Sequence, residues 1–358
     1  MKKFIVALLS TLLLLLAACD NQPQIVSSSP NQTVSPQTAS PALTIVSDFF
    51  PFTEDVYMRY TGQGNEYAEF ETYVDYVNGG TVQIRAINPG TESVSVYVID
   101  NDALKKVYSD GETYYRLDYT RQTNMDEILI KEPIEIGTTW TLAGGAVRSI
   151  TAVDSPIIVP YGAYKALEIT TSAEGYTTKD YYVSGIGLVK QDFISDEDAS
   201  VIISSLLETV ENGTPLELNL RFYYPDLDND RLVYIEKPIE LYTGTRVPGM
   251  FEQQMKQVPT DSGLHPLMSE NTVILGLNYN KETGVASIDL SADFIGDMNV
   301  DSALEGLTLA SIANTLGSYF QTDKVSITIE GNDYASEHFL FKKGDYLISQ
   351  IDGIPAYP

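Results

Sequence analysis

The sequence predicts a mixed protein: an N-terminal antiparallel β meander or partial barrel followed by a small α/β domain. First, apolar residues alternate in short runs between Ile45 and Val210, which is the period of half-buried strands. Second, helical and strand periods interleave after Asn212. We therefore expect a boundary there. The expected parts are a β-rich domain over residues 45–211, an α/β domain over residues 212–345 and a tail over residues 346–358.

The amino end has the pattern of an export signal. Lys2 and Lys3 precede an uncharged stretch from Phe4 to Ala18, which is shorter than the roughly 20 residues that cross a bilayer. The stretch ends with Leu16, Ala17 and Ala18, directly before Cys19, the one cysteine of the chain. This ending resembles the bacterial lipobox. The resemblance implies that residues 1–18 are a lipoprotein signal peptide and that Cys19 receives acyl chains such as palmitate; the alternative is a buried thiol.

Residues 19–44 are expected to form a flexible tether. They are rich in Ser, Pro, Gln, Asn and Thr, with too little apolar matter to offset the entropy lost on ordering. The chain has 22 Lys and Arg against 49 Asp and Glu, a net charge of −27. This acidity argues against nucleic acid as a binding partner. It also requires that lipid, rather than a basic patch, hold the protein at the membrane. The predicted location is the extracytoplasmic face of the cell membrane.

Turn residues divide the β-rich segment into strands of about 6–10 residues, with no helix expected between them. The Asn78-Gly79-Gly80 turn supplies positive φ angles between alternating runs at 70–76 and 82–86, so we expect a hairpin. IGTTW at 136–140 and YYVSGIGLV at 181–189 resemble a pattern of exported bacterial β proteins, which bears on fold and not on chemistry. Further turns are expected at residues 88–90, 109–111, 144–145 and 184–185.

The α/β segment is expected in the order strand, helix, strand, strand, helix, strand, so that two helices cover one face of a small sheet. Apolar residues over 247–258 have helical spacing, with Pro248 near the start. A second helix over 302–320 is expected to open with a capping box of Ser302 and Glu305. The expected strands are residues 216–222, 273–277, 285–290 and 325–329.

Several motifs of this segment carry a family resemblance. The most specific is ASIDLSADF at 286–294, and the others are LRFYYP at 220–225, GLHPL at 263–267, SIANTL at 311–316 and VSITIEG at 325–331. Together they resemble the GerMN domain of sporulation and spore germination, found in bacterial envelope lipoproteins, over residues 218–331. The resemblance implies a small α/β unit similar to the ring-building modules of secretion machinery, which associates with its own copies or with other envelope proteins.

The residues that match the family motifs are expected to be structural. Asp289 can point away from the core, and Ser291 can turn the chain where the strand ends through its own side chain. The alternative for Asp289 is a catalytic carboxylate. The chain departs from the family pattern over residues 234–249. The family-motif residues are Asp289, Leu290, Ser291, Phe294, Thr315, Leu316 and Gly331.

Asp226, Asp228 and Asp230 are spaced like the opening of a calcium-binding loop. The sixth position is Arg231 where an EF-hand has Gly, and the twelfth is Lys237 where it has Glu. We therefore expect a solvated acidic turn between strands, with a weak calcium site as the alternative.

The sequence favours a protein that acts by contact rather than by catalysis. Its two histidines, His265 and His338, lie in neither an HExxH nor a Gly-x-Ser-x-Gly spacing. No catalytic residue, cofactor or metal is therefore predicted. The expected partners are envelope or sporulation proteins, or a second copy of the chain. One alternative is binding of cell-wall glycan or a small ligand by the β-rich domain, where Tyr side chains could stack on sugars. Another is an enzyme whose triad assembles from distant segments.

Overall fold

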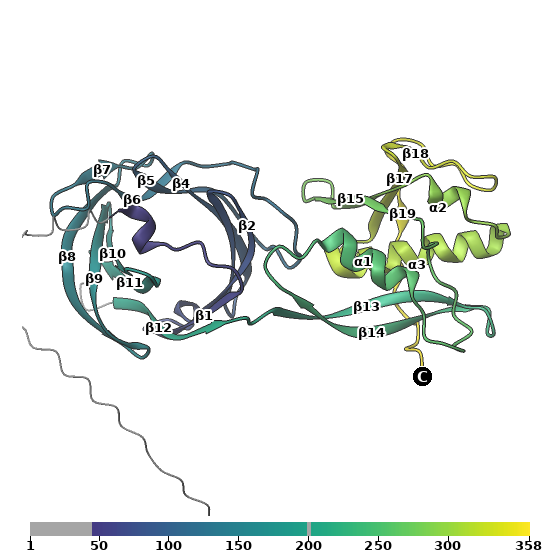
Figure 1. The fold of residues 1–358 in the computed structure, drawn as a ribbon, viewed down its shortest axis with the longest axis horizontal. Helices are drawn as coiled ribbons and strands as arrows, with labels where there is room; N and C mark the ends of the chain where they lie inside the picture. The colour runs from purple at the N-terminus through teal and green to yellow at the C-terminus, as the bar shows by residue number, and fades with distance from the viewer. Residues whose placement is uncertain (1–44, 199–201) are drawn as a thin grey trace, which may run out of the picture. The chain divides into compact units, whose positions relative to one another are not determined.

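The computed structural model describes residues 45–198 and 202–358 (Figure 1). Cys19, its lipobox and the expected tether lie outside these residues. The described fold is mostly β, with a large antiparallel sheet and a C-terminal α/β region, which confirms the predicted fold class. No helix within these two ranges combines the length and the apolar character that a membrane span requires.

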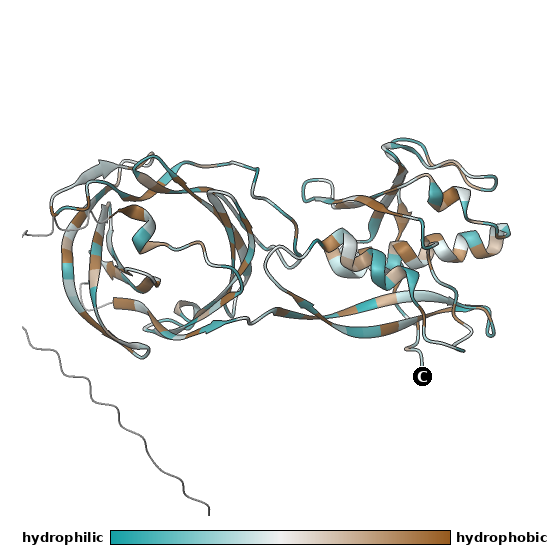
Figure 2. Ribbon diagram, in the orientation of Figure 1, coloured by the Kyte–Doolittle hydropathy of each residue, from teal (hydrophilic) through white to brown (hydrophobic). Residues whose placement is uncertain are grey.

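In the described residues, the large sheet has twelve strands arranged as two meanders that meet where β1 pairs with β12. The sheet order is β6-β5-β4-β3-β2-β1-β12-β11-β10-β9-β8-β7. The strands are β1 (Val56–Gln63), β2 (Phe70–Asn78), β3 (Thr81–Ile87), β4 (Glu92–Asp100), β5 (Ala103–Gly111), β6 (Glu127–Lys131), β7 (Thr139–Thr141), β8 (Val147–Val159), β9 (Gly162–Ala173), β10 (Tyr176–Val183), β11 (Gly187–Ser195) and β12 (Ile202–Asn212). Figure 2 shows apolar and polar residues alternating along these strands.

The sheet curls into a ring, and a single-turn 3₁₀ helix, η1 (Val46–Phe49), lies on its concave side (Figure 1). Val46 and Phe49 pack there in one buried cluster with Leu104 and Trp140. A second 3₁₀ helix, η2 (Glu66–Ala68), precedes β2. Among the described residues of this segment, helical structure is limited to these two 3₁₀ pieces, and no α-helix lies between the strands, as the turn pattern predicted.

Most of the predicted turns of this sheet are present. Gly79 has φ +62° between β2 and β3, as the hairpin requires. The turn expected at 109–111 was wrong, because β5 continues to Gly111 and pairs with β4 along its length. A loop over residues 112–126 follows instead.

The α/β region has two sheets with helices between them. The hairpin is β13 (Leu216–Asp226) and β14 (Arg231–Leu241). The other sheet, five-stranded in the described residues, contains β15 (Ile274–Asn280), β16 (Val285–Leu290), β17 (Lys324–Ile329), β18 (Asn332–Asp333) and β19 (Leu347–Ile348). The helices are α1 (Val247–Lys256), α2 (Asp293–Gly296) and α3 (Ser302–Phe320). Because β16 and β17 are parallel, α3 serves as their crossover.

Two details of the predicted order were wrong. Strand β14 lies where we expected only a loosely matching segment, so the hairpin covers α3 on the side away from the five-stranded sheet. Helix α3 also begins differently, since its N-cap is Asp301, whose Oδ1 accepts a hydrogen bond from Leu304 N at 2.9 Å. Glu305 is buried rather than part of a capping box. A helix covered on both sides buries polar positions as well as its apolar stripe.

Candidate functional site

The family-motif residues tie the α/β region together. Asp289 Oδ1 accepts hydrogen bonds from Thr328 Oγ1 at 2.7 Å and from Gly331 N at 2.8 Å, which joins the ends of β16 and β17. Ser291 Oγ accepts a hydrogen bond from Val273 N at 3.0 Å. These bonds shape the point where β16 ends, and no reacting group is needed to explain them.

The other family-motif residues pack inside the same region. Leu290, Phe294 and Leu316 are buried, and Thr315 Oγ1 accepts a hydrogen bond from Tyr223 N at 3.0 Å, which attaches α3 to β13. Gly331 has φ +76°, a conformation that side chains with a Cβ rarely adopt. The structure therefore places these residues where packing and turn geometry require them.

The acidic segment between β13 and β14 forms a turn. Asp226 is buried, and its Oδ2 accepts hydrogen bonds from Asn229 Nδ2 at 2.8 Å and from Arg231 Nε at 3.4 Å. The hydrogen bond from Asn229 and the pairing with Arg231 hold the pKa of Asp226 below its ordinary value. Asp228 and Asp230 are exposed. Across the described ranges, no group of three or more His, Cys, Asp or Glu side chains is placed to hold a metal ion.

The two histidines have different surroundings. His338 Nδ1 lies 2.7 Å from Glu305 Oε2, while Tyr334 donates a hydrogen bond to Glu305 Oε1 at 2.7 Å. Burial alone would raise the pKa of Glu305, but hydrogen bonds from Ser336, Tyr334 and His338 hold that pKa below its ordinary value. The cluster fastens the segment after β18 to the first turn of α3. His265 Nδ1 is buried, and no hydrogen-bond partner for it is found among the described residues.

The feature of this region most suited to recognition is strand β15, at the edge of its sheet. Within the described residues it pairs with β16 alone. The backbone groups of its first residue already have partners from α1 and the residue before it: Ile274 N donates a hydrogen bond to Glu252 Oε2, and Ile274 O accepts one from Arg246 Nη2, both at 3.1 Å. Leu275 is nevertheless 46% exposed and Val273 is 37% exposed. An unpaired strand edge with exposed apolar side chains is a template for another strand.

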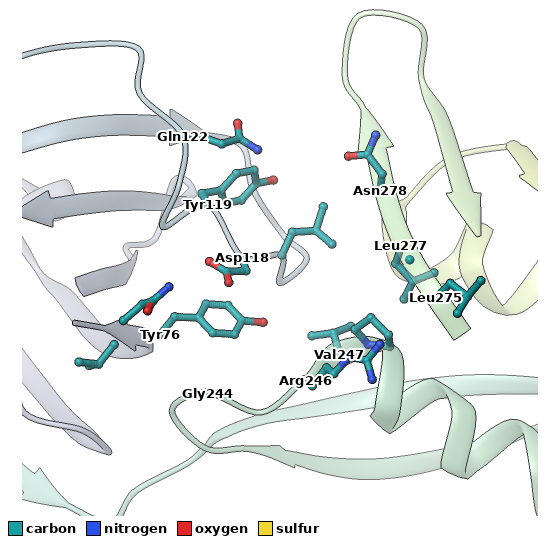
Figure 3. A pocket seen from close by; sticks show the side chains of 15 residues that line it. Tyr76, Asp118, Tyr119, Gln122, Gly244, Arg246, Val247, Leu275, Leu277 and Asn278 are labelled. Atoms are coloured by element: carbon teal, nitrogen blue, oxygen red, sulfur yellow. The ribbon is translucent and has the colours of Figure 1, made fainter. Parts of the chain in front are cut away.

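A groove of about 550 Å³ lies beside this edge. Figure 3 shows Leu275, Leu277 and Asn278 on the β15 side and Tyr119 and Gln122 across the space from them. The segments that line the groove are β15, residues 246–248 at the start of α1, Gly244, the end of β2 and the loop over residues 117–122. The site therefore combines an open backbone edge with a space for side chains.

The groove carries little charge. Its described lining includes one acid, Asp118, and one base, Arg246. Asp118 Oδ1 accepts hydrogen bonds from Thr120 N at 2.8 Å and from Thr120 Oγ1 at 2.6 Å. Burial raises the pKa of Tyr76 to about 12, so its hydroxyl stays protonated and donates to Thr245 O at 3.3 Å. The walls thus suit neutral, partly apolar groups.

Hydrogen bonds hold the two walls of the groove together. Thr243 N donates to Asp55 Oδ1 and Asp55 N donates to Thr243 Oγ1, each at 2.7 Å. Gly244 N donates to Asp75 O at 2.9 Å. After β15, Lys281 Nζ lies 2.7 Å from Asp110 Oδ2 of the large sheet. A site held at both ends is largely preformed, which lowers the entropic cost of binding.

A buried ionic cluster lies behind this seam. Asp75 is fully buried between Arg85 and Arg116, with Arg85 Nη2 at 3.3 Å and Arg116 Nε at 3.5 Å from its carboxylate oxygens. Arg116 Nη2 also donates to Tyr242 O at 2.7 Å, and Arg116 N donates to Tyr319 Oη at 2.8 Å. The cluster thereby connects the large sheet to β14 and α3.

Sequence reasoning missed both the groove and the cluster. A signal for the groove did exist: residues 273–277 read VILGL, and a continuous apolar run is typical of a strand that is covered on both faces. The edge position of β15 leaves Leu275 uncovered. No local pattern marks the cluster, because Asp75 and Arg116 are joined only by the fold.

Comparison with known proteins identifies part of this region. The family described as Germane, sporulation and spore germination, matches residues 221–335. No curated protein matches the chain.

Three solved structures have a weaker likeness. The tandem GerMN domains of the sporulation protein GerM from Bacillus subtilis are 20% identical, with 37% of this chain and 45% of that chain covered and a TM-score of 0.27. A candidate lipoprotein from Clostridium perfringens is 23% identical, with 37% of this chain and 91% of that chain covered and a TM-score of 0.23. A candidate exported protein with a YmcC-like fold from Bacteroides fragilis is 13% identical, with 46% of this chain and 99% of that chain covered and a TM-score of 0.28. The match spans less than half of the GerM structure, and likenesses this weak carry no conclusion about function.

The family match covers the segments that carried the resemblance in the sequence, including ASIDLSADF at 286–294 and VSITIEG at 325–331. The prediction of a GerMN domain is thereby confirmed: over residues 221–335, this chain carries a Germane domain of sporulation and spore germination.

Proposed function

We propose that this chain is a non-catalytic, lipid-anchored envelope protein that binds another protein through strand β15 and the groove beside it. In this proposal, acyl chains on Cys19 hold it at the extracytoplasmic face of the cell membrane. The process it serves is sporulation, spore germination or remodelling of the cell envelope, as the Germane domain indicates.

One observation carries the proposal: an apolar run on an edge strand is left uncovered next to a groove. A partner in extended conformation can pair with the free edge of β15 through its backbone. Its alternate side chains then enter the groove, in the mode known as β-augmentation. Backbone pairing supplies affinity, while the neutral walls select apolar or uncharged side chains.

The charge of the chain indicates what kind of partner fits. With 22 basic against 49 acidic residues, two copies of the chain repel each other. A partner with an apolar extended segment and a basic surface around it is instead attracted. We therefore assign the edge to a different, basic envelope protein and not to a second copy.

Hydrogen exchange on the captured complex tests this assignment. The chain should retain its partner from a solubilised envelope extract, and the amides of residues 275–279 should exchange more slowly in the complex than in the free chain. Leu275→Lys should weaken capture at least tenfold, because it places a cation where apolar contact and a basic partner are expected.

Leu227→Lys is the matched control. Leu227 is 51% exposed, similar to Leu275, and lies in the turn between β13 and β14. The Leu227→Lys variant should bind the partner as tightly as the unaltered chain does. Equal capture by Leu275→Lys, or unchanged exchange over β15 in the complex, would refute the site. A dimer that forms without any partner would refute the choice of a different protein.

A further inference from the structure

A second cavity lies on the concave side of the twelve-stranded sheet and has a volume of about 510 Å³. Its walls come from β1 to β4, from β11 and β12, from the turn before β11 and from residues 50–53 after η1. Pockets of about 300–1,000 Å³ are the usual size of small-ligand sites. This cavity is separate from the groove beside β15, and its lining shares no residue with that groove.

The cavity exists because the ring is wider than its side chains. About eight strands close a ring that side chains can fill, whereas this sheet has twelve in the described residues. Helix η1 and its neighbours fill one part, where Leu104 and Leu167 are fully buried. In the other part Met58, Phe70 and Ile84 line the cavity and stay only half-buried. Apolar side chains directed into an unfilled interior gain contacts when a ligand enters.

The lining has no formal charge. Of the described residues that form it, none is Asp, Glu, Lys, Arg or His, although charged residues make up 20% of the chain. Several of its polar groups already have partners. Tyr60 Oη donates to Leu188 O at 2.8 Å, and Gln191 Nε2 donates to Asp180 Oδ1 at 2.6 Å. A sugar would need free partners for its hydroxyl groups, so these walls favour an aliphatic ligand.

We propose that this cavity binds a single uncharged aliphatic chain, such as one acyl chain of a lipid. The acyl chain of the ligand lies along the apolar side chains of β1 to β4, and the polar head of the ligand stays at the mouth of the cavity. Binding is driven by the removal of apolar surface of both the ligand and the cavity from water. This proposal is independent of the partner site at β15, and Leu275→Lys should leave it unaffected.

Displacement of a neutral fluorophore tests the proposal. N-phenyl-1-naphthylamine, whose emission rises in apolar surroundings, is added to the purified, unacylated chain, followed by 1-monolauroylglycerol below its micelle concentration. We expect the emission to rise on binding and to fall as the lipid displaces the dye. Absence of dye binding, or dye that the lipid does not displace, would overturn the proposal. Displacement by the neutral sugar chitobiose would overturn it in favour of glycan binding.

A matched pair of substitutions locates the site. Thr72 on β2 lines the cavity, whereas Thr209 on β12 is next to Val210, a lining residue, and so faces the other side of the sheet. Thr72→Phe should fill the cavity and weaken dye binding at least tenfold, while Thr209→Phe should bind like the unaltered chain. Ala86→Phe, at a second lining position, should repeat the effect of Thr72→Phe. Unchanged binding in both cavity variants would show that the dye binds elsewhere and would refute the assignment.

Discussion

Replacing Asp75 by Ala is expected to destabilise the protein strongly, because this carboxylate is the shared counter-ion of two buried guanidinium groups. Arg85 and Arg116 are each 1% exposed. Without Asp75, Arg85 keeps one carboxylate, that of Glu92 at 3.1 Å, whose side chain is 27% exposed. Among the described residues, Arg116 has no other ion pair and keeps backbone carbonyl partners such as Tyr242 O, together with the face of the Tyr76 ring, whose centroid lies 4.8 Å from the guanidinium carbon.

The magnitude follows from these remaining contacts. Breaking a buried ion pair by removal of one partner costs about 3–5 kcal/mol. The carbonyl groups of Tyr115 and Tyr242 still accept hydrogen bonds from the two arginines, which places the expected loss near the lower end, at about 3 kcal/mol. Equilibrium urea denaturation followed by circular dichroism measures this loss as a lower transition midpoint.

The control for Asp75→Ala is an exposed ion pair in the same chain. Arg221 Nε lies 3.0 Å from Glu236 Oε2, and both side chains are about half exposed. Glu236→Ala should leave the urea midpoint nearly unchanged, because solvent screens this pair. A loss below about 1 kcal/mol for Asp75→Ala would refute the reasoning, because that is the range of exposed pairs. It would mean that water reaches the two arginines.

Two further predictions concern α3. Because the folded pKa of Glu305 lies below its ordinary value of 4.5, its stabilising contribution is present above that pH and is lost as the pH falls through the folded pKa. The unaltered chain should therefore lose stability below about pH 4.5 more steeply than Glu305→Gln does, and parallel urea midpoints across this range would contradict the role given to Tyr334 and His338. Asp301→Ala should cost about 1 kcal/mol by removing the hydrogen bond to Leu304 N, whereas Asp301→Asn, which keeps the accepting oxygen, should cost much less; equal losses would argue against capping.

Helix α3 shows what a sequence can predict well. Its apolar spacing over residues 309–320 and the expected cap at Ser302 predicted a helix that ends at Phe320, and the helix spans Ser302–Phe320. The signal is strong because the helix runs for five turns and ends at Gln321 in the left-handed conformation, with φ +54°. The identity of the N-cap was wrong because Asp301 and Ser302 are both good caps, and only the buried position of Glu305 decides between them.

Strand β14 shows how a local signal can be hidden. Val233, Ile235, Ile239 and Leu241 alternate with polar residues, but Pro238 interrupts the run and argues against a strand. The strand forms because β13 pairs with it from Leu216 to Asp226. On its other edge, the bridge to the C-terminal segment is at Tyr234, four residues before Pro238, so the missing N–H of the proline breaks no pairing found there among the described residues. Pairing with β13 therefore determines that these residues form a strand, which the local composition alone does not predict.

The groove and the cavity could not be predicted, because each depends on contacts between distant segments. The cavity requires that Val56 on β1 pair with Asn212 on β12 and thereby join the two meanders. Alternation along a strand predicts which residues face inward, but not how many strands share the interior. Strand number sets the width of the ring, and so it determines whether inward side chains fill the space or line a cavity.

The apolar core extends across the place where the large sheet ends. Val94 and Val96 of β4 belong to the same buried cluster as Phe320 of α3. Tyr115 packs against Phe320 and against Tyr279 of β15, with ring centroids 5.2 Å and 5.1 Å apart. A break in sequence pattern near Asn212 therefore does not coincide with a break in packing. Since Tyr279 anchors the far end of β15, the large sheet helps to hold the partner-binding edge in place, and both proposed sites are best studied in the whole chain.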